Sequence, residues 1–229
     1  KSLLVCPPNR TEFIAAPSSS IMPSAFTEPS RVEKITLSTG TSIGNGWGNF
    51  ISLKGFDASN SNAFKDIDGV LYSKTGGTLV AMPGLARDSY SISQEADTIS
   101  LNAFADCHIA DLYLGDKKYN INPFAFTNFH GNLTISGNVN LRTIPNVVFI
   151  GGVKYFNGFD GTLTLLGEIT PTMARSLGDL DENATIRCEG AYIDLVRKYW
   201  KGNIESTTTA WIIDRTPGYT DVSFSINMA

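Results

Sequence analysis

The stretch Phe129-His-Gly-Asn-Leu-Thr-Ile-Ser-Gly137 recurs further along the chain as Phe159-Asp-Gly-Thr-Leu-Thr-Leu-Leu-Gly167. Each copy carries two aliphatic side chains separated by one threonine. Residues two apart on a strand point to the same face, and the residue between them points to the other. Each copy therefore predicts a short strand that directs its aliphatic pair into a core and its threonine outward.

A shorter pattern accompanies these strands. Ala-Phe or a similar pair precedes an aliphatic strand pattern at four places, and the phenylalanines are Phe26, Phe104, Phe126 and Phe149. The spacing of three and four residues before each phenylalanine suits a turn or a short helical segment. A unit of about 22 residues cannot bury both parts alone, so copies must stack and share a core. The sequence therefore predicts an α/β solenoid with a parallel sheet on one side and these four phenylalanines aligned inside it.

One block of the chain resembles a known family. Asn60-Ser-Asn-Ala-Phe-Lys-Asp-Ile-Asp-Gly-Val-Leu-Tyr-Ser-Lys-Thr-Gly-Gly-Thr-Leu-Val-Ala-Met-Pro83 is similar to the hairpin block of BspA-like leucine-rich repeat proteins of bacterial cell surfaces, and Ala103-Phe-Ala-Asp-Cys107 resembles their repeat. The resemblance implies a leucine-rich repeat right-handed superhelix with a short-stranded parallel sheet and an inserted β-hairpin block at about 60–83. It extends over about residues 1–190, which we expect to form the repeat domain.

The C-terminal part is expected to close the stack. Tyr192, Leu195, Val196, Tyr199 and Trp200 recur at the spacing of one helix face, which predicts an amphipathic capping helix. Beyond it, alternating apolar residues and a Pro-Gly turn predict a terminal β-hairpin over 207–229. Residues 191–229 are thus expected to form a second unit, a capping helix followed by a hairpin.

Composition narrows the possible functions. The 229 residues carry a formal net charge of −4 with a pI near 5.2, which argues against nucleic-acid binding through phosphate contacts. Apolar runs are far shorter than the roughly 20 residues that span a bilayer, so no membrane-spanning segment is expected. The chain opens without a methionine or an apolar leader, and a missing upstream segment is expected. With the resemblance, this implies a secreted or cell-surface protein, with an outer-membrane lipoprotein as one possibility.

Residues suited to catalysis are few. His108 and His130 are the only histidines, and neither lies in a metal-ligand spacing. For His130 a structural or rim position is favoured over a general-acid role. Cys6, Cys107 and Cys188 are odd in number and far apart, which favours buried core residues over disulfides or a zinc site. We therefore expect no enzyme, no catalytic residues, no metal and no cofactor.

The outward positions of the predicted sheet remain as a binding surface. If the aliphatic pairs face inward, the side chains that face outward are polar and include one aromatic: Lys34, Thr36, Tyr113, Thr134 and Thr164. This composition suits recognition of a protein or a glycan. The predicted function is adhesion to a host or neighbouring-cell protein or glycan. The alternative is a structural spacer that displays neighbouring domains and has no ligand of its own. The oligomeric state is left open.

Overall fold

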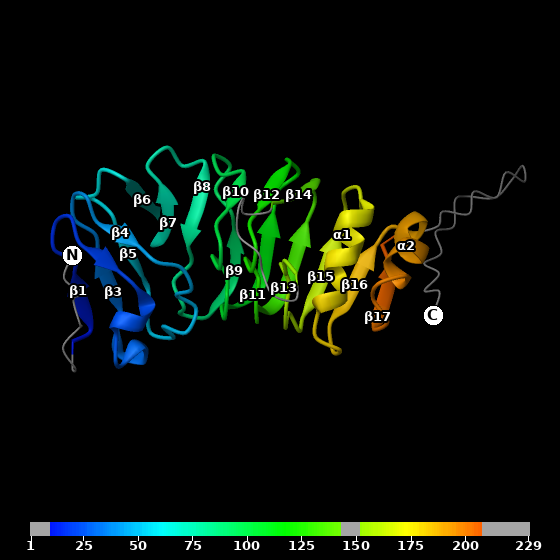
Figure 1. The fold of residues 1–229 in the computed structure, drawn as a ribbon, viewed down its shortest axis with the longest axis horizontal. Coiled ribbons are helices and arrows are strands. Elements are labelled where there is room, and N and C mark those ends of the chain that lie inside the picture. Colours follow the sequence, from blue (N-terminus) through cyan, green and yellow to red (C-terminus); the bar gives the residue numbers. More distant parts are fainter. Residues whose placement is uncertain (1–9, 143–151, 208–229) are drawn as a thin grey trace, which may run out of the picture.

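Successive segments of the chain lie side by side along one long axis, with the two ends of the described chain at opposite ends of the molecule (Figure 1). The computed structural model describes residues 10–142 and 152–207. Short strands form two facing layers over most of this length. Their inward side chains meet in a hydrophobic interior that runs along the molecule.

The longest layer is a parallel sheet of six strands. Its strand order is β17-β16-β15-β13-β11-β9. The aliphatic residues of the repeated stretch pair across it in register, Leu112 with Leu133, Leu133 with Leu163, and Leu163 with Ile186. The strands are β9 (Arg87–Ser91), β11 (His108–Leu114), β13 (His130–Ile135), β15 (Thr162–Leu165), β16 (Thr185–Cys188) and β17 (Asn203–Ser206).

The facing layer is a mixed sheet that gives way to two helices. Its order is β14-β12-β10-β8-β7-β6, and β7 pairs antiparallel with both β6 and β8. Beyond β14 the layer continues with two short helices that pack against each other (Figure 1). The elements are β6 (Phe64–Ile67), β7 (Val70–Ser73), β8 (Thr78–Ala81), β10 (Thr98–Ile99), β12 (Tyr119–Ile121), β14 (Val139–Leu141), α1 (Pro171–Ser176) and α2 (Ile193–Arg197).

The N-terminal end has sheets and a core of its own. A three-stranded parallel sheet, β1-β3-β5, and a two-stranded one, β2-β4, enclose a cluster around Phe26 and Trp47. Strand β7 separates this cluster from the main one, because Val70 and Tyr72 pack in the main core while Leu71 packs in the N-terminal core. The strands are β1 (Glu12–Ile14), β2 (Ser20–Ile21), β3 (Lys34–Thr36), β4 (Ser42–Ile43) and β5 (Gly55–Asp57).

Stacked aromatic rings fill the main core. The ring of Phe126 lies between those of Phe104 and Phe156, with centroids 5.3 and 5.5 Å away and near-parallel planes. Phe129 and Phe159, from the two copies of the repeated stretch, form a second stack at 5.6 Å. The predicted alignment of four phenylalanines is therefore only partly correct: Phe104 and Phe126 stack, Phe26 belongs to the separate N-terminal core, and Phe149 lies outside the described residues.

The glycines that both copies share have a steric role. Gly131 has a φ of 129°, and a Cβ there would collide with the carbonyl oxygen of Ile109 on the neighbouring strand. A Cβ at Gly161 would collide in the same way with the carbonyl oxygen of Gly131. Both positions therefore need glycine so that the backbones can approach at the start of each strand.

The predicted fold class, an α/β solenoid of the leucine-rich repeat type, is wrong. The described residues form four separate sheets, one of them mixed, with only two α-helices, of six and five residues. The segments around Phe104 and Phe126 form turns, the first of the two predicted alternatives, and not short helices. Asn102, Asp106, Phe124 and Asn128 have positive φ there, which a right-handed helix cannot accommodate.

The capping helix included in that prediction does not close the stack. Helix α2 is short and packs over the interior, where Val196 and Trp200 are buried. The chain then returns to the sheet as β17, which pairs in parallel with β16 and forms the last strand of the described sheet. The predicted terminal hairpin falls almost wholly in 208–229, outside the described residues.

Replacing Phe126 with alanine should destabilise the protein by about 3–5 kcal/mol, because the ring is fully buried between two others. The free energy of unfolding would be measured by urea denaturation. Ile51→Ala serves as a control, since 56% of that residue is exposed, and should cost well under about 1 kcal/mol. A loss below about 1 kcal/mol for Phe126→Ala would show that the stack does not hold the core together.

Candidate binding surface

The side of the six-stranded sheet that points away from the interior, here called the outer face, presents regular rows of polar side chains. Alternation along each strand produces them: Leu112 and Leu114 are buried, whereas Tyr113 between them is 46% exposed. In-register pairing then aligns equivalent positions on neighbouring strands. The row through Tyr113, here called the Tyr113 row, comprises Ser91, Tyr113, Thr134, Thr164, Arg187 and Glu205.

A second row lies two residues earlier on each strand. This Asn132 row is joined by side-chain hydrogen bonds. The Asn132 amide donates to the Asp111 carboxylate at 3.0 Å, and its oxygen accepts from the backbone N–H of Thr162 at 3.2 Å. Further along, the Asn203 amide donates to the Thr185 hydroxyl at 3.1 Å. The members are Ser89, Asp111, Asn132, Thr162, Thr185 and Asn203.

The two rows together are polar and carry little net charge. Arg187 in the Tyr113 row pairs with Glu205 at 2.6 Å, so these charges compensate each other. Asp111 contributes one further carboxylate, which already accepts from Asn132. The ring of Tyr113 stands among hydroxyl and amide groups. Such a surface can supply an apolar platform and hydrogen-bonding groups without a strong electrostatic field.

The structure brings together three of the five residues that the sequence singles out. Tyr113, Thr134 and Thr164 are consecutive members of one row, with Thr134 in register with both neighbours. Lys34 and Thr36 lie instead on β3, in the separate N-terminal sheet. They therefore do not extend the Tyr113 row.

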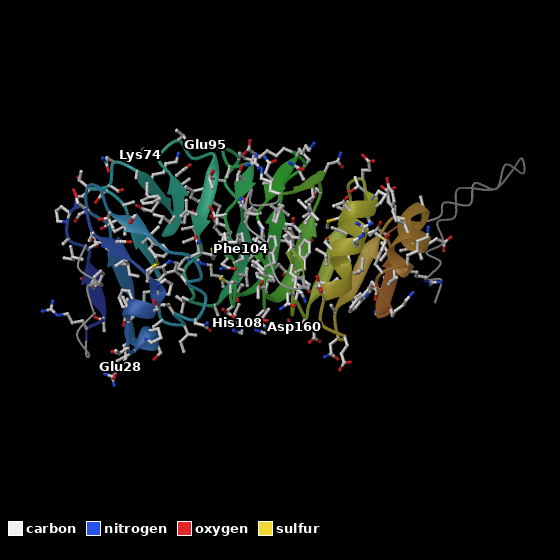
Figure 2. The ribbon with its side chains drawn as sticks, in the orientation of Figure 1. Glu28, Lys74, Glu95, Phe104, His108 and Asp160 are labelled. Carbon is white, nitrogen blue, oxygen red and sulfur yellow. The ribbon has the colours of Figure 1, made fainter. Side chains whose placement is uncertain are left out.

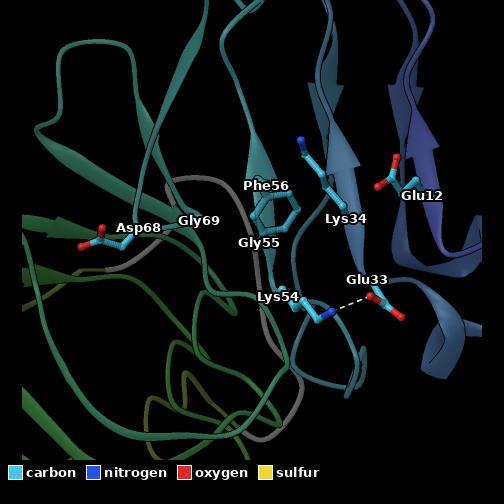
Figure 3. A pocket seen from close by; sticks show the side chains of 8 residues that line it. All are labelled: Glu12, Glu33, Lys34, Lys54, Gly55, Phe56, Asp68 and Gly69. Carbon is cyan, nitrogen blue, oxygen red and sulfur yellow. Dashed lines mark hydrogen bonds and ion pairs between the residues drawn. The ribbon is translucent and has the colours of Figure 1, made fainter.

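Lys34 lines a shallow depression of about 380 Å³ on the N-terminal sheet (Figure 3). Gly55, which pairs with Lys34, lies against the backbone of Gly69, and a Cβ at Gly55 would come within 2.7 Å of Gly69 Cα. Both lysines at the wall of the depression already have partners: Lys34 pairs with Asp57 at 2.9 Å, and Lys54 with Glu33 at 2.6 Å. The lining residues are Glu12, Glu33, Lys34, Lys54, Gly55, Phe56, Asp68 and Gly69.

The Lys34–Asp57 pair changes the acidity of both groups. The hydrogen bond from Lys34, with further bonds from Ser59, lowers the pKa of Asp57 from 3.8 to about 2. The same contact with Asp57 raises the pKa of Lys34. At neutral pH Lys34 is thus held in an ion pair with Asp57 within the sheet. Its positive charge is already compensated and is less suited to binding an anionic ligand.

The cysteine thiols of the described residues are buried in the main core. Cys107 is 1% exposed and Cys188 is fully buried, and burial raises the pKa of both thiols. They are therefore protonated at neutral pH and behave as small apolar side chains. Cys6 lies outside the described residues. Among residues 10–142 and 152–207, no three His, Cys, Asp or Glu side chains converge in a way that could hold a metal ion.

Sequence reasoning missed the Asn132 row and the neighbours of the histidines. Asp111 and Asn132 lie two residues before Tyr113 and Thr134, so strand alternation directs them to the same outer face. That alternation could have identified them. The alignment of the two repeated stretches also places His130 opposite Asp160, and the structure joins these side chains at 2.8 Å. The pairing of His108 with His130 needed the register of β11 and β13, which the sequence alone does not show.

Comparisons with known proteins are sparse. No protein-family model matches the chain, and no curated protein matches it. Among solved structures it is similar to the crystal structure of the pneumococcal vaccine antigen PcpA, with 15% identity and a TM-score of 0.37, over 78% of this chain and 60% of that one. A superposition this weak defines neither the fold nor the activity of this chain. The resemblance to BspA-like proteins stays a prediction.

Replacing Lys34 with glutamine should lower the urea midpoint at pH 6 but have little effect at pH 2. Asp57 has a depressed pKa in the folded protein, so its contribution to stability is present above about pH 4 and is lost as the pH falls toward 2. Lys118→Gln removes the same charge from an exposed residue and serves as a control. A difference between Lys34→Gln and wild type that is equally large at pH 6 and pH 2 would contradict this account.

Proposed function

We propose that the chain is a non-enzymatic binding module of a secreted or cell-surface protein, and that it recognises a hydroxyl-rich ligand, a glycan, through its outer face. The observation that carries this proposal is the exposed ring of Tyr113 in one row, beside the aligned hydroxyl, amide and carboxylate groups of the Asn132 row. An aromatic ring beside planar polar groups can contact the apolar face of a sugar while its neighbours bond the hydroxyls.

The shape of the surface supports an extended ligand. Both rows continue over six parallel strands, from β9 to β17, so a linear chain laid across the strands would meet similar groups on each strand. Low net charge in these rows favours a neutral ligand at this position over nucleic acid or a strongly charged protein. Among the described residues, no helix is both long enough and apolar enough to cross a bilayer.

One observation favours the second candidate, a structural spacer. Several outer-face side chains bond one another across strands, as Asn132 does with Asp111 and Arg187 with Glu205. Cross-strand bonds of this kind stabilise a sheet whether or not a ligand is present. A spacer would carry the same rows and bind nothing.

A glycan array probed at pH 7.5 separates the two. Tyr113→Ala should weaken binding at least about fivefold, the loss expected when a central aromatic contact is removed, and Thr134→Arg should weaken it by covering the row with a bulky charged side chain. Neither change should lower the melting temperature, because both side chains point away from the core.

Ile14→Ala is the matched control. Ile14 is 70% exposed but lies on β1 of the N-terminal sheet, so its truncation should leave glycan binding unchanged. Equal binding by wild type and Tyr113→Ala would remove the outer face as the binding surface. No signal on glycan or protein arrays for the wild type would favour the spacer.

A further inference from the structure

Both histidines of the chain meet at one edge of the outer face. His108 is the first residue of β11 and His130 the first of β13, and the two are paired because the register of these strands shifts between His108 and Asp111. Their rings are nearly parallel, with centroids 4.4 Å apart. His108 is exposed, and it lies with Asp160 along the lower edge of the sheet (Figure 2). Two titratable rings are thus held in contact beside the Tyr113 and Asn132 rows.

A depression of about 350 Å³ adjoins the stacked rings. Arg87 in its wall is fixed, because its guanidinium Nη2 donates to the backbone oxygens of Asp68 at 3.2 Å and Lys54 at 3.4 Å. Three nitrogen-bearing side chains and one carboxylate therefore surround the hollow. It is lined by Ala86, Arg87, Asp88, His108, Ile109, Ala110 and His130.

Asp160 sets the orientation of His130. Its carboxylate lies 2.8 Å from Nδ1, and an ionised carboxylate only accepts, so Nδ1 carries the proton. In the neutral ring Nε2 is then an acceptor and cannot bond an anion. In the protonated ring Nε2 is a donor as well. Acidification therefore changes what this ring offers to a ligand.

The formal charge of the cluster depends on whether its two imidazoles are protonated. At neutral pH the formal charges are one cation, Arg87, and two carboxylates, Asp88 and Asp160, for a sum of −1. Protonation of both rings changes that sum to +1. Two further carboxylates, Asp106 and Asp111, lie nearby on the same chain segment. They accept from amide groups of Asn49, Asn128 and Asn132 and do not line the hollow.

We propose that this depression binds an anionic group of an acidic polysaccharide, a carboxylate or a sulfate, and that it does so under mildly acidic conditions. Arg87 supplies a permanent positive charge, and the two imidazoles supply donors that exist only when protonated. The site goes beyond the proposed function, because Tyr113 and its row take no part in it. It would add selectivity for acidic glycans at one edge of the outer face.

The test is calorimetric titration with an oligogalacturonate at pH 5.5 and pH 7.5. Its carboxylates stay ionised at both values, whereas free imidazole titrates between them. We expect at least about tenfold tighter binding at pH 5.5. The fully methyl-esterified oligomer, which carries no charge, should show no such difference. A parallel titration with a dextran sulfate oligomer distinguishes recognition of a carboxylate from recognition of a sulfate. Binding of either oligomer that depends on the imidazoles supports the site.

The double variant His108→Gln/His130→Gln is the decisive control, because it leaves no histidine in the chain. It should bind at both pH values as weakly as the wild type does at pH 7.5, with an unchanged melting temperature at pH 7.5. The proposal is overturned if neither anionic oligomer binds, if binding is equal at both pH values, or if the double variant keeps the pH dependence. Tyr113→Ala should keep the pH dependence, so failure of the two proposals can be told apart.

Discussion

The stacking of phenylalanine rings between the two layers is the interaction on which the rest of the structure depends. Phe126 contacts Phe104 on one side and Phe156 on the other, and Phe129 and Phe159 stack beside them. Parallel rings stacked in this way hold the chain segments that carry them at one spacing. The parallel strands built on these segments, β11, β13 and β15, are thereby kept in register. Shared glycines at the strand starts allow the backbones to approach.

The register in which the strands pair determines which polar side chains lie next to one another on the outer face. Because every second residue points outward, aligned leucines inside imply aligned polar residues outside, and the Tyr113 and Asn132 rows follow from the same pairing. The contact between His108 and His130 needs a further feature, an irregularity in β11 between His108 and Asp111 that shifts the register by one residue. The proposed glycan-binding surface and the proposed anion site thus lie on the same sheet.

Much of this surface could be predicted from sequence, because strand alternation is a local property. The Leu-x-Leu patterns correctly place Leu112, Leu133 and Leu163 inside and the residues after them outside. The fold class could not, because the pattern before the strands suits either a turn or a short helix. The positive φ of residues such as Asn102 and Phe124, which makes these segments turns, is not visible in the sequence. Nor does the pattern show that β7 divides the interior, which removes Lys34 from the surface that carries Tyr113.

The most direct test of this account is a double-mutant cycle between Phe126 and Phe156, each replaced by leucine. If stacking fixes the spacing of the segments, the two substitutions should be coupled by about 0.5–1.5 kcal/mol in the free energy of unfolding. A coupling energy of zero would mean that the rings only fill volume, and that the alignment of the strands has another origin.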